Sequence, residues 1–255
     1  MRNGTSTTDM TFDQLRAAFD RTATLAERAR RFIEDRLQMI MNLKTPKKLI
    51  EGPLWVVHFV PIAGLAGRRA VDLKVISGEY TKFLGHDWGG GDRTFNLDGL
   101  VVHPGGGREN IFDAYNHIFR IGALEGVSNG GAKREVSPGI PRSLVWSLEM
   151  SQFFRSSTDL FLDAAKRWGD AGPAVLSFAV LHVEGYELLI DVRRFSRALS
   201  DRSHLILPET WIDNIESADI DAIVRPLMDM LWQAFGMERC LDFDATTGIY
   251  NPRRL

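Results

Sequence analysis

The feature that most constrains the fold is a long N-terminal stretch without glycine or proline. Thr11 and Gln14 match a capping box, in which the threonine accepts a free amide of the first turn and the glutamine reaches back to the cap. Apolar residues then recur at helical spacing, and neither helix breaker occurs before Pro46. We therefore predict one long helix from Thr11 to Asn42, interrupted, if at all, around residues 22–24.

A β-rich middle is expected after this helix. The apolar segment 54–62 predicts a strand, whereas 71–84 fits a helix or a strand equally well. Residues 85–93 include three consecutive glycines and are interpreted as a loop. Further strand-like segments, separated by turn residues, predict an antiparallel meander over 94–103, 110–120 and 123–128.

The C-terminal half is expected to alternate between helices and strands. A second long helix is predicted from Pro141, a favoured first-turn residue, to Trp168, with Gly169 as its stop. A third is predicted from Ala218 to Phe235, with a kink at Pro226. Apolar segments between them predict short strands over 174–183, 186–191 and 204–208.

These elements predict the α/β (α+β) class, with a mostly antiparallel sheet packed against three long helices. We expect a disordered tail over residues 1–10 and a single domain over residues 11–255, with a possible subdivision near 129–140. A single cysteine excludes an internal disulfide, and the usual structural zinc spacings are absent. Without a secretory pattern or a spanning apolar segment, the sequence predicts a cytoplasmic protein with no membrane contact, no bound metal and no cofactor.

Charge is distributed unevenly along the chain. Residues 27–48 carry seven bases and three acids, whereas residues 209–244 carry nine acids and two bases. The two segments can pair with each other, or the first can form a basic face for an anionic partner. In the second case, the candidate nucleic-acid-binding residues are Arg28, Arg31, Lys44, Lys47 and Lys48.

A hairpin with its turn at 104–109 would gather polar residues on one face. Asp98 would then lie opposite Tyr115. Alternation would bury Phe95, Leu97, Val101, Phe112 and Ile118. The other face would carry the candidate catalytic residues Asp98, Asp113, Tyr115 and His117, which could act in acid–base catalysis or hold a divalent ion. The alternative interpretation is the solvated face of a half-covered sheet.

Other motifs are weak. His86 and Asp87 are adjacent in the glycine-rich loop, but a metal phosphohydrolase needs further ligands that the sequence does not place there. The glycine runs at 89–91 and 105–107 do not match a phosphate-binding loop, and no serine lies in a GxSxG elbow.

Several segments resemble a known family of bacterial proteins. They are ERARRFIEDRLQMIMN (27–42), VVHFVPIAGLA (56–66), FNLDGLVV (95–102), FRIGALEGV (119–127) and PLMDMLWQAFG (226–236). They are similar to the carboxy-terminal region of proteins that begin with a Schlafen-type AlbA-like domain, described as DNA-binding or ATP-binding. That amino-terminal domain has no counterpart in this sequence, so the resemblance transfers no functional residue.

Two functional hypotheses follow. The first is a non-enzymatic accessory or interaction domain of a nucleic-acid-associated bacterial system, with a separately encoded protein partner and weak, non-specific nucleic-acid binding. The second is a metal-dependent enzyme or small-ligand binder that uses the polar face of the 94–120 hairpin. A concave site holding Asp98, Asp113 and His117 would favour the second hypothesis.

Overall fold

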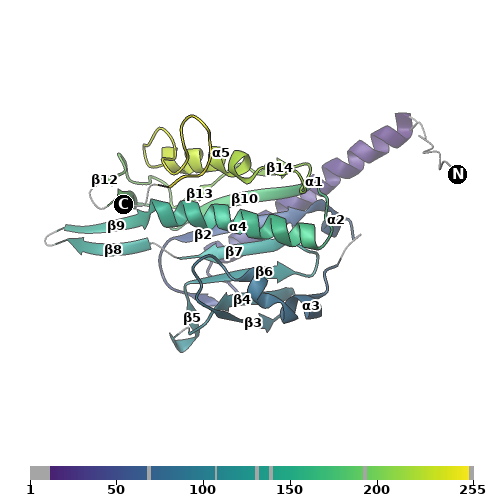
Figure 1. Ribbon diagram of the computed structural model, residues 1–255, viewed down its shortest axis with the longest axis horizontal. Helices are drawn as coiled ribbons and strands as arrows, with labels where there is room; N and C mark the ends of the chain where they lie inside the picture. Colours follow the sequence, from purple (N-terminus) through teal and green to yellow (C-terminus); the bar gives the residue numbers. More distant parts are fainter. Residues whose placement is uncertain are drawn as a thin grey trace.

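In the computed structural model of the chain, the described residues are 12–67, 70–106, 108–129, 132–137, 140–191 and 194–252. The expected disordered tail at 1–10 and the expected cap at Thr11 lie outside these ranges. The chain is an α+β protein in which long helices pack on a mostly antiparallel sheet (Figure 1).

The three long helices expected from the sequence are present among the described residues. α1 spans Phe12–Met41 without a break at 22–24, α4 spans Ser147–Arg167, and α5 spans Ile220–Gln233 and runs on through Pro226. The ambiguous segment 71–84 is helical. The short helical segments are α2 (Ile62–Leu65), α3 (Leu73–Gly78), η1 (Tyr80–Phe83) and η2 (Arg108–Asn110).

Within the described ranges, eight strands form one antiparallel sheet. Its order is β13-β10-β2-β7-β6-β4-β3, and β14 also pairs with β10. The strands are β2 (Leu54–Pro61), β3 (Gly91–Phe95), β4 (Gly99–Pro104), β6 (Ala114–Phe119), β7 (Leu124–Ser128), β10 (Ala174–Leu181), β13 (His204–Ile206) and β14 (Thr210–Ile212).

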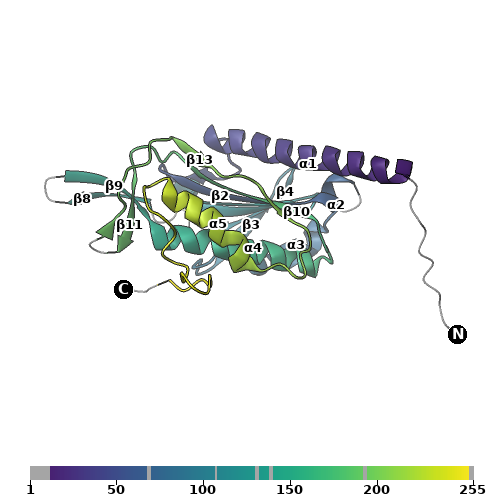
Figure 2. The same cartoon turned by 90° about the horizontal axis from the view of Figure 1, so that it is seen from above.

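Helices cover both faces of this sheet. α1 lies across one face, and α4 and α5 lie on the other (Figure 2). One apolar cluster joins α1 to the sheet through residues such as Ile33, Val56 and Val127. A second cluster joins α4 and α5 to the opposite face through residues such as Phe154 and Phe178. The central strands are therefore buried on both sides, and every residue of β2, β6 and β10 is buried.

A smaller sheet extends from one end of the large one. Its order is β12-β11-β9-β8, formed by β8 (Ala132–Ser137), β9 (Ile140–Trp146), β11 (Glu187–Asp191) and β12 (Arg194–Phe195). A short parallel pair is formed by β1 (Lys48–Leu49) and β5 (Ile111–Phe112). The predicted subdivision near 129–140 falls on the β8–β9 hairpin and on residues outside the described ranges.

The predicted start of the second long helix is wrong. Residues from Pro141 to Trp146 belong to β9, and α4 begins at Ser147. Only residues 144–146 of β9 pair with β11, so Pro141 has a ladder partner on the β8 side alone. Proline has no N–H to donate to a second neighbouring strand. A position that pairs with one strand only therefore tolerates it, as the first turn of a helix does.

The predicted hairpin register is also wrong. Residues 94–103 do not form one strand, because the chain turns at 96–98, where the Asn96 side chain accepts a hydrogen bond from the Gly99 amide at 2.7 Å. Asp98 therefore faces Arg120, whose amide donates to its carbonyl at 3.0 Å, and not Tyr115, a shift of five residues. An odd shift exchanges the two faces of a strand.

Burial at the hairpin follows the new register. Val101, Phe112 and Ile118 are buried as predicted. Phe95 and Leu97 were expected in the core but are 56% and 89% exposed, because they lie at the β3–β4 turn. His117 was expected at the surface but is only 1% exposed. The β6 face that carries it is covered by α1.

Candidate functional site

The four candidate catalytic residues do not form a common site. Tyr115 and His117 are buried on the face of β6 that α1 covers. Asp98 lies in the exposed turn beyond one end of β6, and Asp113 directly precedes the other end. The polar hairpin face that would have joined them is therefore absent.

A buried network of ionisable groups lies under α1. The Arg36 guanidinium from α1 donates two hydrogen bonds to the Glu125 carboxylate on β7, through Nε at 2.8 Å and Nη2 at 2.9 Å. The Tyr115 hydroxyl donates to the same carboxylate at 2.8 Å, and His58 Nε2 on β2 lies 3.1 Å from it. These four side chains connect one helix to three neighbouring strands.

Two groups of the network, Glu125 and Tyr115, have pKa values far from neutral pH. Burial alone would raise the pKa of Glu125, but hydrogen bonds from His58 and Arg36 and the charge of Arg36 hold it well below its usual value. Burial and the adjacent Glu125 carboxylate raise the pKa of Tyr115 well above its usual value. Because neither group titrates near neutral pH, the network suits a structural anchor better than proton transfer.

His117 is a separate buried group on the same face. Its Nε2 lies 3.3 Å from the Asn96 side-chain oxygen, its ring packs on Phe119, and its Nδ1 has no hydrogen-bond partner among the described residues. Burial lowers the pKa of His117 to about 4. The ring is therefore neutral at pH 7.

The five candidate nucleic-acid-binding residues lie at two places on the outer side of α1 and the loop after it. Arg28 and Arg31 are exposed near the middle of the helix, and Lys44 and Lys48 are exposed beyond its C-terminal end. About 15–20 Å of helix separates the two groups. Lys47 is half-buried over the Phe112 ring, and desolvation lowers its pKa.

Pairing between the basic and acidic segments is limited. Arg30 Nε lies 3.3 Å from Glu209, which joins the two segments. Arg31 instead pairs with Glu27, one turn earlier on α1. Arg28, Lys44 and Lys48 form no ion pair with any described residue. Both alternatives for the charge asymmetry therefore retain some support, one from Arg30 and the other from the three unpaired cations.

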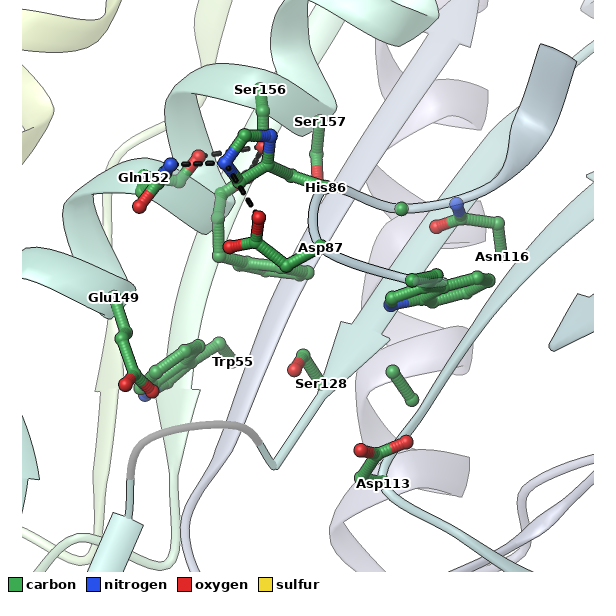
Figure 3. A pocket seen from close by; sticks show the side chains of 14 residues that line it. Trp55, His86, Asp87, Asp113, Asn116, Ser128, Glu149, Gln152, Ser156 and Ser157 are labelled. Carbon is green, nitrogen blue, oxygen red and sulfur yellow. Dashed lines mark hydrogen bonds and ion pairs between the residues drawn. The ribbon is translucent and has the colours of Figure 1, made fainter. Parts of the chain in front are cut away.

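A cleft that the sequence did not indicate lies on the other side of the sheet. It has a volume of about 270 Å³ and lies between α4 and the loop 84–91 (Figure 3). His86 and Asp87 come from the loop, Gln152 and Ser156 come from α4, and Asp113 precedes β6. Of the predicted candidates, only Asp113 contributes to this cleft.

Local contacts hold the loop beside α4. His86 Nε2 contacts the Gln152 amide and lies 3.2 Å from the Asp87 carboxylate. The Asn116 amide donates to the Phe83 carbonyl at 2.8 Å, which fastens the start of the loop to β6. A Cβ at Gly85 would lie 2.5 Å from the Trp88 ring, so the indole can fold back over the loop only because residue 85 is glycine.

None of the protein-family models matches the chain, and the searches of curated proteins and of solved structures find no similar protein. Among the described helices, none is long and apolar enough to cross a membrane.

Proposed function

We propose that the chain is a non-enzymatic interaction domain of a cytoplasmic, nucleic-acid-associated bacterial system, and that α1 is its contact element. The observation that carries this proposal is the Arg36–Glu125 pair. It fixes the inner side of α1 to the sheet. Arg28, Lys44 and Lys48 are exposed on or just after the same helix and form no ion pair within the described ranges. The resemblance to proteins with a Schlafen-type AlbA-like domain supports the nucleic-acid context.

The chemistry of this surface suits the phosphate backbone. Lysine and arginine contacts to phosphates position a protein on nucleic acid without reading its sequence. Glu27, Glu34 and Asp35 are exposed on the same helix and weaken the attraction. We therefore expect weak binding that needs the separately encoded partner to become tight.

Fluorescence anisotropy with a labelled DNA duplex of random sequence tests the proposal. Three phosphate contacts predict a slope of log affinity against log salt near −2.7, so affinity falls roughly 500-fold between 50 and 500 mM salt. The triple variant Arg28→Gln, Lys44→Gln, Lys48→Gln should lose this binding.

The matched control is Lys74→Gln, Lys166→Gln, Arg202→Gln, which removes the same charges away from α1 and the loop after it. It should bind as the unchanged protein does. Absence of binding at 50 mM salt, or an equal loss in both triple variants, would refute α1 as the contact element. Tight, salt-resistant and sequence-selective binding would contradict the interaction-domain proposal and indicate a true DNA-recognition domain.

A further inference from the structure

The cleft between α4 and the loop 84–91 is acidic. Asp87, Asp113 and Glu149 contribute carboxylates, and no lysine or arginine occurs among the described residues that line it. Asp87 and Asp113 are exposed, and the former has only His86 as its ion-pair partner in the described structure. A cleft of this charge attracts a cation.

The spacing of the acids argues against a metal ion. In the described part of the chain, no three His, Cys, Asp or Glu side chains converge closely enough to hold one. A second hollow, lined by His86, Ser156 and Asp159, adjoins the cleft along α4. The charges are thus spread along a groove, which suits an extended organic cation better than a single ion.

An unsatisfied donor lies in the lining of the cleft. Trp55 is 1% exposed, and its Nε1 has no hydrogen-bond partner among the described residues. Its indole packs against Phe153 and extends toward the end of the cleft where Glu149 stands (Figure 3). A buried N–H without a partner is unfavourable by about 1–3 kcal/mol, and a ligand with an acceptor group would relieve that cost.

Aromatic side chains complete the lining. The Trp88 indole and the Phe153 ring also contribute to it. Aromatic faces attract ammonium and guanidinium groups, most strongly where water is excluded. Carboxylates, aromatic faces and an N–H donor together match a ligand that carries both a cationic group and a neutral carbonyl.

We propose that this cleft binds a small organic cation of the amine or guanidinium class that also carries a carboxamide acceptor. The cationic group pairs with Asp113, Asp87 adds to the attraction from the loop, and the carboxamide oxygen accepts a hydrogen bond from Trp55 Nε1. This site is independent of the proposed nucleic-acid contact, because it lies on the α4 face of the sheet and α1 covers the other face.

Isothermal titration of the full chain with two probes tests the site. L-argininamide carries both groups, whereas agmatine keeps the cations and lacks the carboxamide. We expect saturable binding of both, with argininamide bound more tightly by about fivefold, the effect of one net hydrogen bond. Asp113→Asn should weaken both probes by about tenfold, and Asp213→Asn, an exposed control remote from the cleft lining, should weaken neither.

The variant Trp55→Phe separates the donor from the charges. It should reduce argininamide affinity to that of agmatine and leave agmatine unchanged, which a general loss of folding would not do. Thermal unfolding of each variant verifies the fold. Lack of saturable binding at millimolar probe, or equal affinities for Asp113→Asn and the unchanged protein, would overturn the proposal. A Trp55→Phe variant that still prefers argininamide would also overturn the role assigned to the indole.

Discussion

Arg36 on α1 and Glu125 on β7 form a bidentate ion pair that is almost completely shielded from solvent. Removing one partner of such a pair leaves the other charge buried and uncompensated. We expect Glu125→Gln to lower the free energy of unfolding by about 3–5 kcal/mol. Urea denaturation measures this loss.

The exposed Arg31–Glu27 pair on the same helix is the matched control. Glu27→Gln removes the same kind of partner in water and should change stability by less than about 1 kcal/mol. Equal effects of the two glutamine substitutions would contradict the anchoring role of the buried pair.

Burial of His117 predicts a pH dependence of stability. Its pKa is about 4 in the folded protein and about 6.5 when unfolded, so between these values the unfolded chain binds the extra proton. Stability from this group is complete above pH 6.5 and falls as the pH drops toward 4, by up to about 3 kcal/mol. The charges of Glu125, Arg36 and Asp98 also act on this group.

Replacement of His117 by phenylalanine keeps a ring against Phe119 and removes the titration. The difference in urea midpoint between about pH 7 and about pH 4.5 should shrink in this variant. If the urea midpoint changes by the same amount between these pH values in both proteins, His117 is not the titrating group.

The corrected strand register distinguishes two leucines three residues apart. Leu97 is exposed in the β3–β4 turn, whereas Leu100 is fully buried beside Ile118. We expect Leu97→Ala to change stability by less than about 0.5 kcal/mol. Leu100→Ala should cost about 2–5 kcal/mol in denaturant titrations. The opposite order would support the hairpin register first predicted from the sequence.

A close backbone contact requires glycine at position 99. An added Cβ would overlap the carbonyl oxygen of Ile118 on the neighbouring strand. Gly99→Ala should therefore lower the melting temperature, because the strands must separate locally. Gly78, near the end of α3, has nothing within 4 Å of an added Cβ. Gly78→Ala should leave the melting temperature unchanged or slightly raised, since alanine favours helix.

The three long helices were predictable from local sequence, apart from the start of α4, and the strand register was not. Helical spacing identifies α1 and α5 because each buries one side only. β2 and β10 are buried on both faces, so their sequences are almost continuously apolar and lack the alternation that sets a register. β6 is also buried on both faces, but it carries Asn116 and His117 side by side, so its polar residues do not mark a solvent face. The polar hairpin face was predicted on the assumption that only one face was covered.

The buried network and the cleft depend on contacts between distant parts of the chain. Arg36 was counted only as one of the seven bases of residues 27–48, and neither His58 nor Glu125 was a candidate site residue. Trp55 and Gln152 line the same cleft only because β2 and α4 pack together.

The pairing of β2 with β10 also bears on how the chain is synthesised. Each of the eight residues of β2 pairs with a residue of β10, and the whole segment 62–173 lies between the two strands. At 5–20 residues per second, a ribosome needs roughly 5 to 20 seconds to make that segment. During this interval β7 can cover one edge of β2, but the other edge stays open on an apolar strand. The nascent chain is then most prone to pair with a second copy of itself, so slow elongation or high expression should favour aggregation through β2.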